Sequence, residues 1–281
     1  MNIMTALSPT AWSLAAAETK AATLTPRMPG ETIVSVERMS VVYQSSRGPI
    51  QAVTNLNMKL KAGEFISILG PSGCGKSTLL SVLAGLRRAS SGIVTLFDEV
   101  MEGNPHRNVG IVFQRPTLLP WETVLENILI PISAMRLNKK DYIDRAHQLL
   151  KLVALEKFAN HYPSELSGGM QQRVAIARAM IHNPGLLLMD EPFAALDAMT
   201  RERMSVELQE ILEKSRQSVL FITHSIPEAV LLSDRIMMMS ASPGRFIEEV
   251  VVDLPRPRTM ETMASSDFAE LCGQLRKLYN H

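Results

Sequence analysis

The chain has 281 residues, 46% of them hydrophobic, so it can bury a sizeable core and is not a disordered protein. Its 29 basic and 28 acidic side chains nearly cancel, which leaves no strong field to favour nucleic acid or an anionic membrane surface. Its partners must therefore be recognised at specific sites. No apolar run approaches the roughly 20 residues that span a bilayer, and two cysteines far apart in sequence predict a reducing setting.

Residues 1–30 are rich in Ala, Thr and Pro, and we expect a mobile extension there. The apolar run at 11–17 is short and has no basic residue before it, so it is a poor signal peptide. Strand-like patterns follow at 32–43 and 52–60, the second with alternating apolar residues. They predict an antiparallel lead-in to an apolar strand at 65–69.

A glycine-rich loop follows that strand and opens a helix predicted at 79–86. Its pattern is G-x-x-x-x-G-K-[ST], in which the curled backbone points N–H groups at phosphates, Lys76 adds a charge and the Ser77 hydroxyl can hold Mg²⁺. A glycine turn with a solvated lysine is the alternative interpretation, and the flanking strand and helix disfavour it. The predicted nucleotide-binding residues of this loop are Gly70, Pro71, Ser72, Gly73, Cys74, Gly75, Lys76, Ser77 and Thr78.

The remaining chain alternates between strand and helix patterns. Strands are predicted at 92–97, 109–113, 185–189, 218–223 and 235–239. Helical spacing over 121–161 predicts a helical insert. A return strand at 246–252, a Pro-Arg break at 255–258 and a final helix from about 267 follow. This alternation predicts an α/β fold with a buried, mostly parallel sheet, and with ligands outside the carboxyl ends of its strands.

Two adjacent carboxylates, Asp190 and Glu191, follow the strand at 185–189 and lie at this ligand edge. Successive residues point in different directions, so Asp190 can join the Mg²⁺ shell while Glu191 faces the terminal phosphate and a water. Glu191 could then be the base that activates this water. A solvated acidic strand end or a helix N-cap is the alternative, and a neighbouring phosphate loop disfavours it.

His224 follows the next strand and is expected at the same edge. Ser225 and Glu228 predict a capping box that fixes the start of the following helix. A histidine here can donate a hydrogen bond to a γ-phosphate oxygen or orient the water. A lone histidine at a strand end is more often structural, and only its alignment with the two carboxylates reverses this expectation.

A second glycine pair, within Leu166–Arg173, opens another helix. Ser167 is placed as its N-cap, and Gly168 and Gly169 leave N–H groups exposed to a second anion. The chain already has a phosphate loop, so this helix end has nothing obvious to bind in its own subunit. Two copies packed head to tail would let each glycine pair reach the nucleotide held by the other copy.

These motifs occur in the order Tyr43, 70–78, Gln114, 166–173, Met189–Pro192, Leu196-Asp197 and Thr223-His224. The set resembles the nucleotide-binding subunit of ABC transporters over roughly residues 32–252, and the signature at 166–173 is highly specific to that family. The resemblance implies a P-loop NTPase core of the ABC ATPase type. It implies an ATPase domain at 31–255, a helical subdomain at about 115–165, and a C-terminal tail and helix at 256–281.

The resemblance also implies a role for each matching residue. Tyr43 would stack on adenine, and Gln114 would sense Mg²⁺ and the γ-phosphate. Glu191 would be the hydrolytic base, His224 the switch histidine, and Asp197 a contact between two copies. The implied Mg²⁺ ligands are Ser77, Gln114 and Asp190.

The chain departs from the common family pattern at one position, and several strings indicate one group within the family. Met170 stands where the commonest family pattern has Gln, so no side-chain contact is predicted there. The strings at 118–122, 192–197, 223–229, 242–244 and 253–258 look like importer subunits for nitrate, sulfonates, taurine and related small oxyanions. By themselves these strings indicate only helix caps, turns and a proline-stiffened exit.

The implied subunit hydrolyses ATP to energise uptake through separate integral membrane permease subunits. Its expected partners are a second copy of itself, the permease and, indirectly, a periplasmic or extracellular solute-binding protein, with no nucleic acid. The expected location is the cytoplasmic face of the cell membrane, as a peripheral subunit. The segment near Leu118–Trp121 would pass motion to the permease.

Two other functions are open to the same sequence. Asn138-Lys-Lys-Asp141 mimics the guanine-reading motif of GTPases. An amphipathic helix follows it at once and no D-x-x-G stretch lies between it and the phosphate loop, so a solvated helix N-terminus is strongly favoured over a GTPase. A soluble ABC ATPase acting on DNA or ribosomes is the second. Such proteins usually carry two cassettes or a long coiled coil, whereas this chain has one cassette and no sustained heptads.

Overall fold

Two β-sheets form the frame of the computed structural model, which describes residues 28, 30–46, 48–194, 196–215, 217–240 and 243–279. The predicted extension at 1–30 lies, except for residues 28 and 30, outside the described residues. The smaller sheet is antiparallel, with strand order β2-β1-β4-β5. Its strands are β1 (Thr32–Ser45), β2 (Gly48–Lys61), β4 (Ser91–Leu96) and β5 (Glu99–Val100). The lead-in predicted from the sequence is therefore confirmed, and β5 is an addition.

The larger sheet has the strand order β10-β9-β3-β8-β7-β6. Its strands are β3 (Phe65–Leu69), β6 (Val109–Val112), β7 (Leu186–Asp190), β8 (Ser218–Thr223), β9 (Arg235–Met239) and β10 (Phe246–Val251). All neighbours pair in parallel except β10, which runs antiparallel to β9. Every residue of β3 and β8 is buried, as expected for central strands with helices on both faces. The carboxyl ends of β3, β7 and β8 thus meet at one edge.

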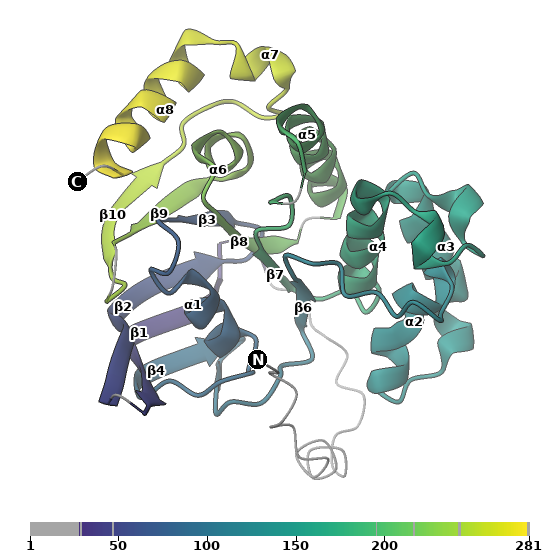
Figure 1. Ribbon diagram of the computed structural model, residues 1–281, viewed down its shortest axis with the longest axis horizontal. Coiled ribbons are helices and arrows are strands. Elements are labelled where there is room, and N and C mark those ends of the chain that lie inside the picture. The colour runs from purple at the N-terminus through teal and green to yellow at the C-terminus, as the bar shows by residue number, and fades with distance from the viewer. Residues whose placement is uncertain are drawn as a thin grey trace.

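Helices cover this sheet and form a separate group beside it. They are α1 (Lys76–Leu83), α2 (Val124–Ala134), η2 (Lys139–Tyr142), α3 (Ile143–Leu152), η3 (Glu156–Phe158), η4 (Pro163–Glu165), α4 (Gly168–Met180), α5 (Ala198–Ser215), α6 (Ile226–Leu232), α7 (Met260–Met263) and α8 (Ser266–Tyr279). In Figure 1, α2, α3 and α4 lie together beyond β6, whereas α1 lies over the strands. No helix among the described residues is long and apolar enough to cross a membrane.

The start of α2 shows how local chemistry fixes the helical insert. The side chain of Thr123 accepts a hydrogen bond from the Glu126 N–H at 3.2 Å and caps the helix. Asn127, fully buried, accepts from the Leu119 N–H at 2.7 Å and donates to the carbonyls of Leu119 and Glu122. The buried amide therefore holds the loop before α2 in one shape.

The helix after the phosphate loop begins and ends earlier than predicted, over residues 76–83 in place of 79–86. The apolar spacing predicts a helix to residue 86, whereas α1 ends at Leu83. Gly85 adopts a left-handed φ of 69°, and a Cβ there would lie 2.1 Å from the Asn104 carbonyl oxygen. Close approach of a second backbone segment, which periodicity does not report, ends the helix early.

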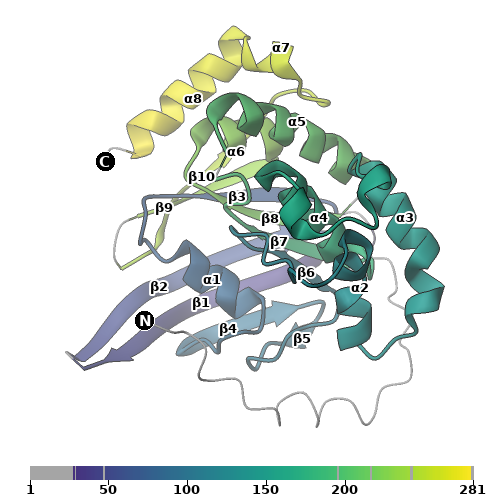
Figure 2. The ribbon, with the colours of Figure 1, turned by 45° about the vertical axis from the view of Figure 1, so that its right-hand side comes forward.

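The C-terminal segment is anchored by a buried arginine. Arg258 is 1% exposed and donates hydrogen bonds to the carbonyls of Val230, Leu231 and Ser233, at the carboxyl end of α6. Its own carbonyl accepts a hydrogen bond from the Gln209 side chain of α5 at 2.9 Å. Both views show α8 running over α6 (Figures 1 and 2). The last helix is thereby tied to the two helices that follow β7 and β8.

Candidate nucleotide-binding and catalytic site

The phosphate loop joins the end of β3 to the start of α1, as its motif requires. Gly73 and Gly75 adopt φ values of 80° and 99°, which a side chain would disfavour. At Gly75 a Cβ would also lie 2.4 Å from Val53 Cγ1 of β2. The backbone can therefore curl around an anion only because these positions are glycine.

Lys76 lies inside this loop and is 5% exposed. Its Nζ donates hydrogen bonds to the Gly70 carbonyl at 2.7 Å and the Pro71 carbonyl at 3.0 Å. The same atom is 3.9 Å from Glu191 Oε1. The ammonium group is thus held at the centre of the site, where it faces both the loop and the carboxylate after β7.

A hydroxyl and a carboxylate meet beside the lysine. Ser77 Oγ donates to Asp190 Oδ1 at 3.4 Å, bringing the first turn of α1 against the end of β7. Burial raises the pKa of Asp190, and the hydrogen bond from Ser77 opposes this rise. Both side chains present oxygen atoms, the ligand type that Mg²⁺ prefers. The predicted metal-binding pair is therefore brought together by the fold.

Glu191 and His224 form the second pair at this edge. Glu191 adopts a left-handed φ of 43°, unusual for a non-glycine residue, and its N–H donates to the Ile222 carbonyl of β8 at 2.9 Å. Its Oε2 lies 3.0 Å from His224 Nδ1. The two residues follow β7 and β8, which pair in parallel, so their side chains lie at the same edge of the sheet.

Of the capping box predicted at Ser225 and Glu228, the serine cap that fixes the start of α6 is confirmed and the return bond from the glutamate is wrong. The Ser225 side chain does cap α6, accepting from the Glu228 N–H at 3.4 Å. The Glu228 carboxylate does not return the bond to the Ser225 N–H. It accepts from the Thr223 hydroxyl instead, at 2.5 Å. A residue before the helix competes for this carboxylate, which the capping pattern does not consider.

Tyr43 of β1 lies beside the first turn of α1. Its hydroxyl is 3.2 Å from Thr78 Oγ1, and the Arg87 guanidinium lies over its ring, 4.2 Å from the ring centre. Sequence reasoning missed this cation–π contact. Arg87 is one of two successive arginines after α1, and nothing in that spacing points to an aromatic ring on β1.

Gln114 follows β6 and is exposed. The carbonyl of the preceding Phe113 accepts a hydrogen bond from the buried Gln172 side chain at 3.3 Å. Gln172 belongs to α4, so the loop at Gln114 is connected to the helix that carries the second glycine pair.

That second pair stands at the open amino end of α4. The Ser167 side chain caps the helix by accepting from the Met170 N–H at 3.3 Å, as predicted. A Cβ added at Gly168 or Gly169 would meet no atom within 4 Å, so both glycines face open space. In both views α4 lies with the helical group, whereas the phosphate loop lies between β3 and α1 (Figures 1 and 2). The chain does not bring its own two anion sites together.

Asp197 stands just before α5 and is exposed. Its Oδ1 accepts a hydrogen bond from the Thr200 N–H at 3.0 Å, and this bond lowers the pKa of Asp197. The carboxylate thus occupies a helix start on the surface.

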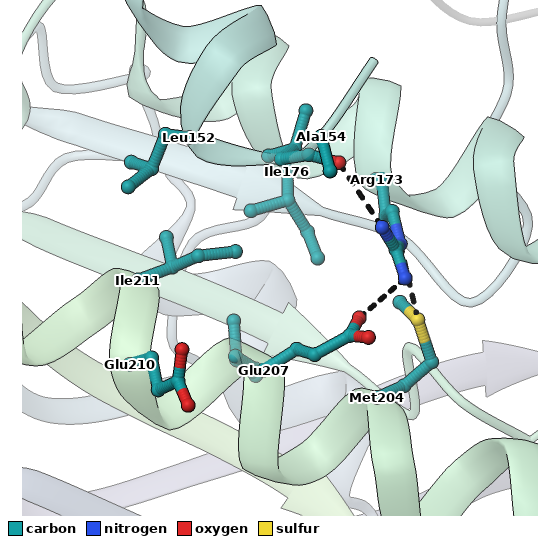
Figure 3. A pocket seen from close by; sticks show the side chains of 10 residues that line it. Leu152, Ala154, Arg173, Ile176, Met204, Glu207, Glu210 and Ile211 are labelled. Atoms are coloured by element: carbon teal, nitrogen blue, oxygen red, sulfur yellow. Dashed lines mark hydrogen bonds and ion pairs between the residues drawn. The ribbon is translucent and has the colours of Figure 1, made fainter.

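Arg173, the last residue of the signature stretch, holds neighbouring helices of its own chain together. It donates to the Val153 carbonyl at 3.2 Å and to Glu207 Oε2 at 2.5 Å, and thereby joins α4 to the end of α3 and to α5. Figure 3 shows it at the wall of a pocket of about 180 Å³ between these three helices. None of the predicted nucleotide-binding residues lines this pocket.

The guanine-reading motif is a helix cap. The Asn138 side chain accepts from the Lys140 N–H at 3.2 Å and donates to Asp141 Oδ1 at 3.1 Å, at the start of η2. The local hydrogen bonds therefore account for this sequence without a nucleotide.

Comparison with known proteins agrees with the geometry. Residues 53–194 match the family described as ABC transporter. The chain is 41% identical to an aliphatic sulfonates import ATP-binding protein, SsuB, of Bacillus cereus, over 85% of this chain and 92% of that protein. It is also 41% identical to the taurine import ATP-binding protein TauB of Rhizobium johnstonii, over 88% of this chain and 96% of that protein.

A solved structure gives the same result. The dimeric post-hydrolysis state of the ATP-binding cassette MJ0796, bound to ADP and Pi, superposes with a TM-score of 0.69 at 34% identity, over 79% of this chain and all of that one. The chain therefore belongs to the ABC transporter family, with the ABC ATPase fold that its motifs predicted. It is an ATP-binding subunit of that family and an ATPase.

Proposed function

We propose that this chain energises the import of a small oxyanion, such as nitrate, a sulfonate or taurine, through a separate membrane permease. The two-copy part of the proposal rests on the glycine pair at the amino end of α4, where a Cβ added to either residue would meet no atom within 4 Å. The ATP-binding cassette MJ0796 is dimeric with ADP and Pi, and relatives named for sulfonate and taurine import share 41% of their aligned residues with this chain.

In the proposed state two copies clamp two ATP molecules. Each ATP lies on residues 70–78 of one copy and on the Ser167, Gly168 and Gly169 segment of the other. Backbone N–H groups at a helix start favour the negative γ-phosphate, so the phosphate charge itself holds the two copies together. Asp197 contacts the other copy near this junction, and Tyr43 stacks on the adenine.

The residues present fit a nucleotide-bound Mg²⁺. Ser77 and Asp190 offer oxygen ligands 3.4 Å apart. Gln114, in the loop after β6, would add a third in this proposal. Mg²⁺ is usually held by one or two carboxylates together with substrate phosphates, so the protein and the nucleotide would share this ion. When bound, Mg²⁺ would neutralise charge on the transferred phosphoryl group.

Glu191 and His224 carry out hydrolysis in this proposal. The Glu191 carboxylate accepts the proton of the attacking water, while Lys76 beside it offsets the charge of the outer phosphates. His224, 3.0 Å from Glu191, orients that water or donates to a γ-phosphate oxygen. Departure of the products would then remove the charge that bridges the two copies, so the dimer opens.

The helical group would pass this opening to the permease. Trp121 is 69% exposed on the loop that Asn127 holds in place, and Gln114 begins the same loop. We accordingly propose an ATPase domain at 31–255 with a helical subdomain at about 115–165, and a tail at 256–281. The subunit would sit on the cytoplasmic face of the membrane, and a solute-binding protein would act on the permease from outside.

Reconstitution tests this function. The chain, a candidate permease and a solute-binding protein are placed in vesicles, and ATP hydrolysis is measured with nitrate, taurine, an alkyl sulfonate or no solute. We expect one of these anions to stimulate hydrolysis and to accumulate inside the vesicles. Co-purification of rRNA or DNA in place of an integral membrane protein, with no response to any solute, would support the soluble ABC ATPase instead.

A further inference from the structure

The segment that carries Asp197 and the turn that carries His224 are connected inside the chain by a half-buried side chain of α5 and a buried side chain of α6. This connection lies outside the phosphate loop. It uses Arg201, in the first turn of α5, and Glu228, in the first turn of α6.

Glu228 fixes the turn at His224. Its side chain is 8% exposed, and its Oε2 accepts a hydrogen bond from the Thr223 hydroxyl at 2.5 Å. Thr223 Oγ1 in turn accepts from the Ser225 N–H at 2.9 Å. The Thr223 hydroxyl takes part in both bonds, and Thr223 and Ser225 are the residues before and after His224. The Glu228 carboxylate thereby helps to fix the backbone turn that presents the histidine to Glu191.

Arg201 connects the same carboxylate to the segment before α5. Its Nε is 3.4 Å from Glu228 Oε1, an ion pair without an aligned hydrogen bond. Its second terminal nitrogen donates to the Leu196 carbonyl at 3.0 Å. The Arg201 N–H donates to the Asp197 carbonyl at 2.9 Å. Any displacement of Leu196 and Asp197 must therefore move the guanidinium that faces Glu228.

The ion pair of Arg201 with Glu228 is not expected to add much to the stability of the fold. Burial raises the pKa of Glu228, so the ionised carboxylate is costly at this position. A buried ion pair is commonly no more stabilising than apolar side chains of the same size, and its best-attested benefit is fixing one arrangement over others. Here the arrangement fixed is that of two segments which both face the proposed junction between copies.

We propose that Arg201, Glu228 and Thr223 are positioning residues that couple the contact at Asp197 to the placement of His224 over Glu191 in the same chain. Docking of a second copy against Asp197 then sets the hydrolytic geometry beside the first copy's own phosphate loop. This inference rests on the proposed function, in which Asp197 contacts the partner copy and His224 acts with Glu191.

The test uses Glu228→Gln in the full chain. Glutamine keeps the length of the side chain and an oxygen that can accept from Thr223, and it removes the charge that faces Arg201. We expect kcat for ATP to fall roughly 3- to 30-fold, the range typical of coupling energies, with KM and the Kd of a fluorescent ATP analogue unchanged.

Glu64→Gln is the matched control. Glu64 Oε1 pairs with Arg235 at 2.7 Å, and the two side chains are 12% and 20% exposed, against 8% and 25% for Glu228 and Arg201. Glu64 precedes β3, so it lies at the sheet edge opposite to the phosphate loop. This variant loses a comparable ion pair, and its kcat should equal that of the unaltered chain.

A second pair of variants keeps the inference testable if Glu228→Gln does not fold. Thr223→Ser retains the bridging hydroxyl and should retain kcat, whereas Thr223→Val removes it and should lower kcat without changing KM. Unaltered kcat in Glu228→Gln or Thr223→Val, or an equal loss in Glu64→Gln, would overturn the coupling. If Glu191→Gln and His224→Ala both kept full hydrolysis, the proposed function would fail instead.

Discussion

Replacing Glu191 by Gln is expected to lower kcat for ATP hydrolysis about 100-fold or more, since a general base contributes on that order, and to leave ATP binding intact. The glutamine amide fills the same space 3.0 Å from His224 Nδ1 and 3.9 Å from Lys76 Nζ. It cannot accept a proton from the attacking water. The bound nucleotide should therefore persist as ATP. Single-turnover hydrolysis of radiolabelled ATP gives the rate, and titration with a fluorescent analogue gives the affinity.

Glu248→Gln provides the control for this prediction. Glu248 is an exposed carboxylate on β10, and its replacement removes the same charge from the surface. Hydrolysis by this variant should match that of the unaltered chain. Normal turnover by Glu191→Gln would show that another group accepts the proton.

Replacing Lys76 by Ala is expected to weaken ATP binding roughly 10- to 100-fold, the loss typical for a hydrogen bond to a charged group. The lysine is buried at the centre of the loop, and Asp190 and Glu191 lie beside it. Without the ammonium group these two carboxylates would repel the incoming phosphates. The Kd for ATP should therefore rise in Lys76→Ala, whereas Glu191→Gln should lower kcat and leave this Kd unchanged.

Lys151→Ala serves as the comparison, because Lys151 is an exposed lysine on α3. It should bind the fluorescent analogue with unaltered Kd. An unchanged Kd for Lys76→Ala would remove the lysine from the phosphate contact, while leaving the assignment of Glu191 untouched.

The sequence predicted the sheet well because its central strands are buried on both faces. β3, β8 and β9 have the predicted bounds, because strands buried between two helical layers consist mainly of apolar residues. The same reasoning placed Asp190, Glu191 and His224 at one edge, and the structure brings these side chains together. Their roles in hydrolysis stay predictions.

Contacts between distant segments could not be predicted from local patterns. The Glu228 carboxylate turns to Thr223 and Arg201 because those residues are brought to it by β8 and α5, not because of its place in α6. Arg87 reaches the ring of Tyr43, far away in the sequence, for the same reason. Each pairing depends on the fold, so it becomes visible only once the strands and helices are placed.

Sedimentation velocity of the Glu191→Gln chain, with and without MgATP, measures directly whether a nucleotide holds two copies together. We expect monomers without nucleotide and dimers with MgATP. Adding Gly169→Asp should abolish the dimer, because an aspartate fits the open space at Gly169 but opposes the γ-phosphate. A chain that remains monomeric at saturating MgATP, or a Gly169→Asp chain that still dimerises with it, would contradict the two-copy site.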